Sequence, residues 1–223
     1  MLRVVQCWDD GVEDDLRLID ILRRHRATAT FNLNPGLHDA TRGHGWSYRG
    51  LKQVRRLARG ELADAYAGFT IANHTVSHPR PLEIPLDRWR REVEDGRHQL
   101  QDIFQQPVLG FAYPFGTNDA ATAEVVRAAG HVYGRTTANA TPCLPAADIM
   151  RWAPDCHFLS PEFWTRFEAA KNSPARVFYF WGHSYELITE DDWAAFDAKI
   201  ARLSADPDVK WSELPEVATS AHP

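Results

Sequence analysis

The sequence alternates short apolar runs with longer amphipathic stretches, and this alternation restricts the fold more than any other feature. The apolar runs are rich in the β-branched and aromatic residues that strands prefer, and the stretches between them have apolar residues at helical spacing. The predicted strands are 2–7, 28–33, 68–73, 108–113, 131–136, 149–152 and 177–182, and the predicted helices are 13–26, 86–104, 118–130 and 190–203. Strand followed by helix about seven times predicts an α/β fold whose parallel sheet is closed or nearly closed into a barrel. An open doubly wound sheet is the alternative.

Length and composition favour one globular enzyme-sized domain. The chain has 223 residues, 44% of them hydrophobic, so we expect a single domain over residues 1–223. The formal net charge is −5 and no basic stripe is visible, which argues against a nucleic-acid partner. No apolar run approaches the roughly 20 residues of a membrane helix, so we expect no membrane association. The N-terminus lacks the pattern of a signal peptide, which favours a cytoplasmic location.

Acids, imidazoles and a tight turn occur at the ends of four of the predicted strands. They are Asp9 and Asp10 after the first strand, Asn73, His74 and His78 after the third, Pro114 and Phe115 after the fourth, and His183 after the last. The carboxyl ends of parallel strands meet at one rim, and barrel enzymes build their active sites there. We therefore expect these residues to lie close together.

The acidic pair and the two histidines together indicate a metal site. His74 and His78 are four residues apart, a spacing that places two imidazoles on one face of a helical turn. Taken alone they could be surface histidines, and the Asp9-Asp10-Gly11 stretch could be an acidic turn. One aspartate with two histidines is, however, a common three-ligand set for a divalent cation. Such a cation would also relieve the repulsion between Asp9 and Asp10, and would leave one carboxylate free as a base.

The order of these motifs resembles the polysaccharide deacetylase family, the NodB-homology domain of carbohydrate esterase family four. That family reads T-F-D-D-G, H-[ST]-x-x-H, R-x-P-[YF]-G and a late L-x-H. Here the corresponding segments are CWDDG at 7–11, HTVSH at 74–78, AYPFG at 112–116 and WGH at 181–183, and ATATFNLNPG at 27–36 resembles the second strand of the family. The resemblance implies a distorted (β/α)₇ barrel over this single domain, and metal-dependent removal of acetyl groups from sugars.

The resemblance also implies a role for each matched residue. Asp9 is expected to be the general base and His183 the general acid, and the backbone N–H of Phe115 is expected to bind the oxyanion. Asp10, His74 and His78 are the expected ligands of one divalent metal ion; zinc is the first expectation, with cobalt, nickel and iron as alternatives. Asp10, His74 and His78 would thus hold the metal beside Asp9.

Two positions depart from the family pattern. The arginine of the third motif, which contacts the base in the family, is Ala112 here, and the Asp-Trp motif that orients the acid histidine has no clear counterpart. A buried carboxylate needs a partner, so another strand end is expected to supply a guanidinium to Asp9. We predict Arg151 in this base-orienting role, with Arg135 as the alternative.

The expected substrate is a small N-acetylated sugar or glycan. Trp181, Trp46 and Tyr113 are the candidate substrate-binding side chains. Two other functions stay open at this point: hydrolysis of another amide, such as a formamide or a cyclic ureide, on the same scaffold, and carbohydrate binding by an inactive protein. The sequence does not determine the oligomeric state.

Overall fold

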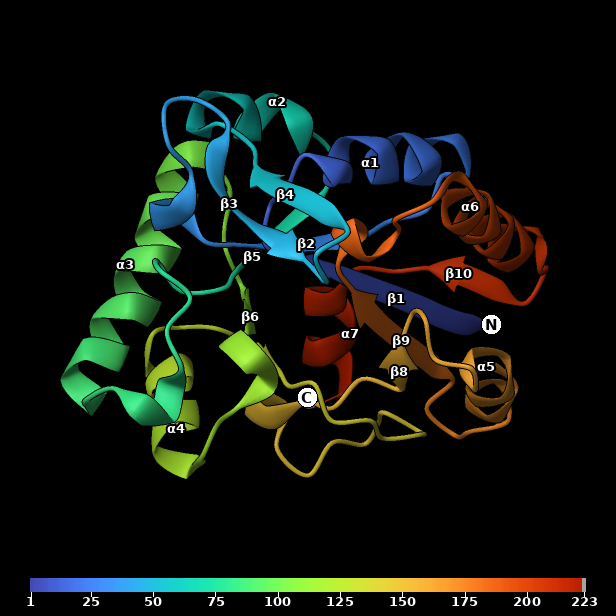
Figure 1. Ribbon diagram of the computed structural model, residues 1–223. Coiled ribbons are helices and arrows are strands. Elements are labelled where there is room, and N and C mark those ends of the chain that lie inside the picture. The colour runs from blue at the N-terminus through green and yellow to red at the C-terminus, as the bar shows by residue number, and fades with distance from the viewer. Residues whose placement is uncertain (222–223) are drawn as a thin grey trace.

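The structure is a computed structural model that describes residues 1–221, and its centre is one curled, parallel sheet (Figure 1). The strands run in the order β7-β6-β5-β2-β1-β9-β8, and β10 pairs with the first residues of β1. Their bounds are β1 Leu2–Asp9, β2 Thr30–Leu33, β5 Thr70–Asn73, β6 Gly110–Ala112, β7 Tyr133–Arg135, β8 Cys156–His157, β9 Val177–Gly182 and β10 Val209–Trp211. The order confirms the predicted parallel sheet, and six of the seven predicted strands are present.

The sheet curls until its two edge strands, β7 and β8, face each other across a gap. The predicted strand at 149–152 falls in this gap, and the prediction was wrong: Ile149–Arg151 form a 3₁₀ turn. Only Trp152 keeps strand-like pairing, as a single parallel bridge to Arg135. The result is a distorted (β/α)₇ barrel in which an irregular segment replaces a full closing strand.

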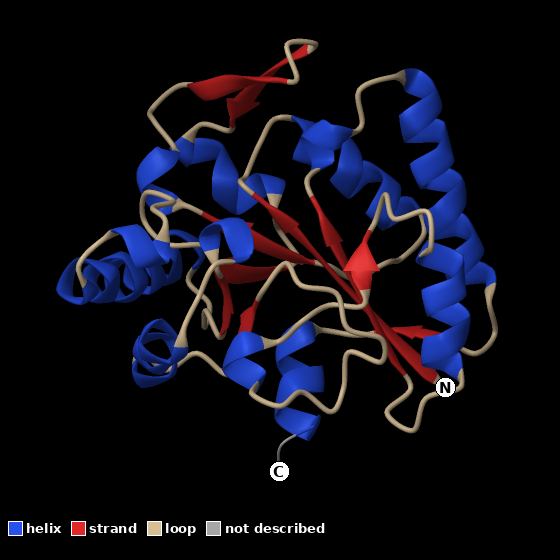
Figure 2. Cartoon of the chain, turned by 60° about the horizontal axis from the view of Figure 1, so that its bottom comes forward, coloured by secondary structure: helices blue, strands red, loops and turns tan. Residues whose placement is uncertain are grey.

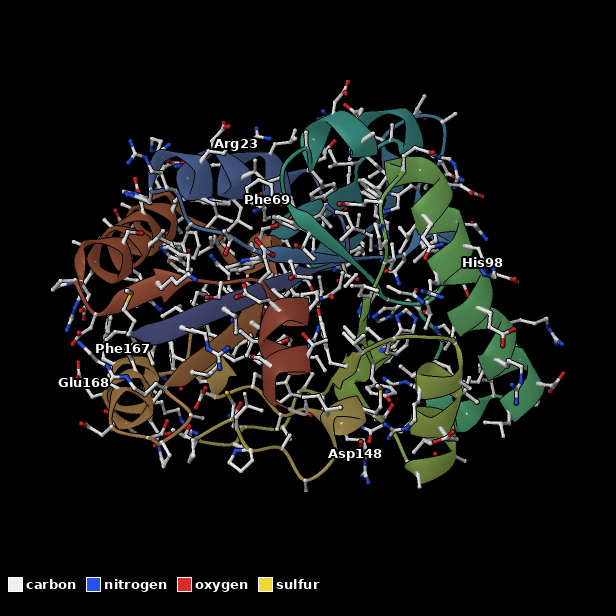
Figure 3. The ribbon with its side chains drawn as sticks, turned by 180° about the vertical axis from the view of Figure 1, so that it is seen from behind. Arg23, Phe69, His98, Asp148, Phe167 and Glu168 are labelled. Carbon is white, nitrogen blue, oxygen red and sulfur yellow. The ribbon has the colours of Figure 1, made fainter. Side chains whose placement is uncertain are left out.

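Helices surround the sheet (Figure 2). They are α1 Asp14–Arg24, α2 Leu62–Ala65, α3 Leu86–Phe104, α4 Ala120–Ala128, α5 Phe163–Lys171, α6 Glu190–Ala205 and α7 Leu214–Ala221. Each longer helix buries one face against the sheet. On α5, for example, Phe167 is buried and meets Phe178 of β9, whereas the next residue, Glu168, is exposed (Figure 3). The four predicted helices are confirmed to within a few residues at their ends.

An antiparallel hairpin lies apart from the main sheet and was not predicted (Figure 2). It consists of β3 Gly43–Tyr48 and β4 Lys52–Arg56. A small apolar cluster of Val12, Val54 and Tyr185 anchors it, and Val12 forms an antiparallel bridge with Arg56. The hairpin thereby packs directly against the loop that follows β1.

Two further features concern the membrane and the cysteines. No helix within residues 1–221 combines the length and the apolar character that crossing a membrane requires. Cys7, Cys143 and Cys156 are buried and reduced.

Candidate active site

The carboxyl ends of β1, β5, β6, β7 and β9 surround a cavity of about 350 Å³. All the residues that we expected to act in catalysis or metal binding line it: Asp9, Asp10, His74, His78, Phe115 and His183. The strand ends bring these residues together because the sheet is parallel and curled, so that the carboxyl ends of its strands meet at one rim.

Asp9 is buried and is bound by Arg135. Nη2 of Arg135 donates to both carboxylate oxygens of Asp9, at 2.5 Å for Oδ1. Arg151, which we predicted in this role, was the wrong choice: its exposed side chain donates from Nε to Oδ1 of Asn118 at 2.6 Å. Arg135 on β7 is the direct neighbour of Ala112 on β6, so the guanidinium comes from the strand beside the one that carries the third motif.

A second polar group fixes the same carboxylate. Nδ2 of Asn32, at the end of β2, donates to Oδ1 of Asp9 at 2.7 Å. Burial by itself would raise the pKa of Asp9, but Arg135, His74 and His183 together hold it well below its usual range. Asp9 is therefore ionised at neutral pH, as a proton acceptor must be.

Asp10 has an arginine of its own, supplied by the hairpin. Arg56 at the end of β4 donates from Nη1 to the backbone carbonyl of Asp10, and its Nη2 lies 3.4 Å from Oδ1. Both side chains are more than nine-tenths buried. Burial opposes ionisation of Asp10, but Arg56 and the neighbouring histidines lower its pKa. Two arginines thus compensate the adjacent carboxylates, which we had expected a bound cation to do.

Asp10, His74 and His78 present one ligand atom each to a common point, with all three atoms within 4.8 Å of one another. The two imidazole Nε2 atoms lie 3.1 Å apart. Nδ1 of His74 is 2.7 Å from the carbonyl oxygen of Ala112 and donates to it, which leaves Nε2 with a free lone pair. Burial, followed by the nearby His74, lowers the pKa of His78 to about 3, so this imidazole is neutral. Two neutral imidazoles and a carboxylate fit a divalent metal.

The loops at this rim have a strained backbone. Of the eight non-glycine residues with positive φ among residues 1–221, four belong to the site: Asp10 (84°), Thr75 (69°), His78 (57°) and Phe115 (58°). Such conformations persist only where the surrounding structure imposes them, and they cluster at functional sites. At His78 the backbone N–H donates to Oγ1 of Thr75 at 3.0 Å, which turns the chain so that both imidazoles face the cavity.

His183 faces the two aspartates from β9. Its Nε2 lies 3.8 Å from Oδ2 of Asp9 and 4.0 Å from Oδ2 of Asp10. Burial would lower the pKa of this imidazole, but Glu186 and the two aspartates raise it to about 9. His183 is therefore protonated at neutral pH and has a proton to donate.

The three candidate substrate-binding residues have different surroundings. Trp181 lines the cavity, with the guanidinium of Arg135 4.8 Å from its ring centre. Tyr113 also lines it, but its hydroxyl donates to the carbonyl of Met150 at 2.8 Å. Trp46 packs against Tyr185, with ring centres 5.2 Å apart, and the structure does not bring it to the cavity wall.

The residues that sequence reasoning missed all act on a residue that it identified. Asn32 binds Asp9, Arg56 binds Asp10, and Glu186 lies beside His183. Arg135 was not missed, because it was the alternative to Arg151 as the partner of Asp9. The position of Asn32 at a strand end was a usable signal. Arg56 had none, because its hairpin was not recognised.

Comparison with known proteins identifies the family of this chain. The family model described as "Polysaccharide deacetylase" matches residues 3–134. No curated protein matches the sequence.

Solved structures resemble the fold at low sequence identity. A family 4 carbohydrate esterase from Streptomyces lividans, in complex with acetate, has a TM-score of 0.60 at 14% identity, covering 96% of this chain and 94% of that one. A CE4 family pseudoenzyme from Bacillus anthracis has a TM-score of 0.59 at 16% identity, covering 97% of this chain and 65% of the other. A polysaccharide deacetylase from Bacillus cereus has a TM-score of 0.50 at 18% identity. The match covers 60% of this chain and only 40% of that protein.

Proposed function

The chain belongs to the polysaccharide deacetylase family, and on that premise we propose that it is a metal-dependent hydrolase that removes the N-acetyl group of an amino sugar or a related small glycoside. The observation that carries the proposal is the convergence of three functions on one cavity. Oδ2 of Asp9 lies 4.0 Å from Nε2 of His74 and 3.8 Å from Nε2 of His183. A base, an acid and the metal donors therefore surround one reacting centre.

In this proposal Asp10, His74 and His78 hold one divalent cation, with zinc as the first candidate and cobalt, nickel or iron as alternatives. When bound, the metal supplies a Lewis acid that polarises the amide carbonyl and lowers the pKa of water. The three proposed ligand atoms lie within 4.8 Å of one another, which supports a shared ion.

The remaining steps belong to the side chains of this chain. Asp9, oriented by Arg135 and Asn32, accepts a proton from the attacking water. The backbone N–H of Phe115 donates to the oxyanion, a contribution of about 3 kcal/mol for one well-placed donor. Nε2 of His183 donates its proton to the amine as the carbon–nitrogen bond breaks. Acetate and a free amino sugar are the products.

The cavity favours a small substrate. Its volume of about 350 Å³ lies at the low end of ligand sites, which matches one or two sugar rings. Trp181 and Tyr113 would form its apolar wall, because both rings line the cavity.

A second candidate function is carbohydrate binding without catalysis. The observation that favours it is the pairing of Arg135 with Asp9 and of Arg56 with Asp10, since this pairing balances the acidic charge without a metal. Hydrolysis of another amide would use the same groups but give different products: a formamide would release formate, whereas a cyclic ureide would open its ring by the addition of water and release no fragment.

The test is a substrate panel on the purified protein, supplemented in turn with zinc, cobalt, nickel and iron. The panel contains N-acetylated monosaccharides and short glycans, with formamides and cyclic ureides beside them, and mass spectrometry identifies the change in mass of each substrate. Release of acetate that Asp9→Asn abolishes supports the proposal. Loss of a formyl group, or the gain of one water without loss of a fragment, moves the activity to the alternative amides. Sugar binding without turnover at any metal assigns the protein to the binding class.

A further inference from the structure

The acid candidate His183 has a second face that the proposed reaction does not use. Its Nε2 points to the aspartates, whereas its Nδ1 is buried and has no hydrogen bond to any residue within 1–221. The nearest carboxylate oxygen is Oε2 of Glu186, at 3.5 Å. This separation is slightly long for a hydrogen bond, and catalytic hydrogen bonds are often long before substrate binds.

Glu186 is held in place by two donors. Its Oε2 lies 2.8 Å from Nε2 of His157 and accepts the backbone N–H of His183 at 3.2 Å. The backbone N–H of Glu186 in turn donates to the carbonyl of His183 at 3.2 Å, so the 3₁₀ turn Ser184–Glu186 is closed on the histidine itself. The carboxylate has only 14% of its side chain exposed. The Glu186 carboxylate is therefore fixed and largely buried, and it lies beside the imidazoles of both His157 and His183.

His157 belongs to the same arrangement through the sheet. It lies on β8, where it is the direct neighbour of Trp181 on β9, two residues before His183. The backbone N–H of Leu159 donates to Nδ1 of His157 at 3.3 Å, so that nitrogen carries no proton. The neutral ring then carries its proton on Nε2 and donates it to Glu186.

This protonation pattern argues against a second metal site. His157, His183 and Glu186 present three ligand atoms within 4.8 Å of one another, as a metal site would. A histidine ligand, however, normally keeps a proton on its other nitrogen and donates it. Nδ1 of His157 accepts a hydrogen bond instead, so its Nε2 is a donor to the carboxylate and not a ligand.

We propose that Glu186, held by His157, is a positioning residue that accepts a hydrogen bond from Nδ1–H of His183 and so directs Nε2 of His183 toward Asp9 and the substrate. Only the effect of Glu186 on catalysis rests on the proposed function. The arrangement itself is a property of the free protein. Without the carboxylate, the imidazole could rotate about its side-chain bonds, and either nitrogen could face the cavity.

The direct test is NMR of the metal-free protein labelled with ¹⁵N-histidine. The wild type should show an Nδ1–H proton of His183 that is protected from exchange with water, assigned by its absence in His183→Gln. Glu186→Ala should lose this protected proton. Glu190→Ala is the matched control, because Glu190 lies four residues further along the chain and, within residues 1–221, forms an ion pair only with Arg17 at the surface; it should keep the signal.

His157 provides a second pair of variants. His157→Gln retains an N–H donor for Glu186 and should keep the protected proton, whereas His157→Leu removes the donor and should lose it. Thermal unfolding of each variant establishes that it is folded. A protected Nδ1–H that persists in Glu186→Ala would overturn the inference, and so would its absence in the wild type.

The kinetic arm uses the substrate found for the wild type. Glu186→Ala should lower kcat roughly 10²-fold, the lower end of the contribution of a general acid, with KM little changed. An equal kcat in Glu186→Ala and wild type overturns the inference even if the proton is present. If no substrate is turned over by the wild type, the proposed function fails, and the NMR result still decides the position of His183.

Discussion

Nη2 of Arg135 lies 2.5 Å from Oδ1 of Asp9, although 126 residues separate the two in the chain. Both side chains are almost completely buried. A single buried carboxylate would be costly, and the guanidinium offsets that cost while fixing the direction in which Asp9 accepts a proton.

Removal of this guanidinium should destabilise the fold. We expect Arg135→Met to lower the free energy of unfolding at pH 7 by about 3 kcal/mol, because Asp9 is left buried and unpaired. Urea denaturation measures it. Arg151→Met is the control and should change stability by less than about 0.5 kcal/mol, since Arg151 is exposed. Equal losses in the two variants would remove Arg135 from this role.

The two adjacent carboxylates should separate by function. Asp9→Asn should retain metal and lose roughly 10²–10⁴-fold in kcat, because it removes the base. Asp10→Asn should weaken metal binding itself, because it removes a ligand. Equilibrium dialysis with zinc and acetate release measure the two effects. Equal loss of metal in both variants would contradict the assignment.

Arg56 should oppose metal binding, because its charge lies beside the carboxylate ligand Asp10. We expect Arg56→Gln to be less stable than wild type without metal, since Asp10 then lacks its partner. Zinc should therefore raise the Tm of Arg56→Gln more than that of wild type. Arg42→Gln, which removes an exposed arginine paired with Glu61, is the control. A zinc shift equal to or smaller than that of wild type would refute this role.

Asp15 should make stability depend on pH. Burial raises its pKa to about 7, although hydrogen bonds from Ser184, Tyr66 and the Val12 backbone lower it. Between about pH 4 and pH 7 the folded state therefore keeps a proton on Asp15 that the unfolded state releases. The stability that this proton binding contributes is fully present below about pH 4 and is lost as the pH rises through about 7.

The difference in unfolding free energy between wild type and Asp15→Asn isolates this effect from all other titrations. From pH 4 to pH 8, wild type should lose stability relative to Asp15→Asn, by an amount on the order of 3 kcal/mol. Chemical denaturation at several pH values measures it. A difference that stays constant with pH would show that Asp15 does not titrate in this range.

Local pattern was sufficient for the parts of the site that follow strand ends. Asp9, Asp10, His74, His78 and His183 were found because apolar runs mark the strands, and a parallel sheet brings all their carboxyl ends to one rim. The apolar spacing that identifies the helices is local as well. At 149–152 the apolar run is too short to identify its own structure, and it forms a 3₁₀ turn instead of the predicted strand.

The sequence by itself therefore determined which candidate catalytic and metal-binding groups meet at the rim, and only the tertiary structure decided which groups hold them. Arg135 and Arg151 both lie near the ends of predicted strands, and nothing local distinguishes them. The register of β6 against β7 does, because it places Arg135 directly beside Ala112. Arg56 and Glu186 reach their partners through a hairpin and a turn whose positions depend on packing. An ion pair depends on distance in space, and that distance is set only when the sheet has curled and closed.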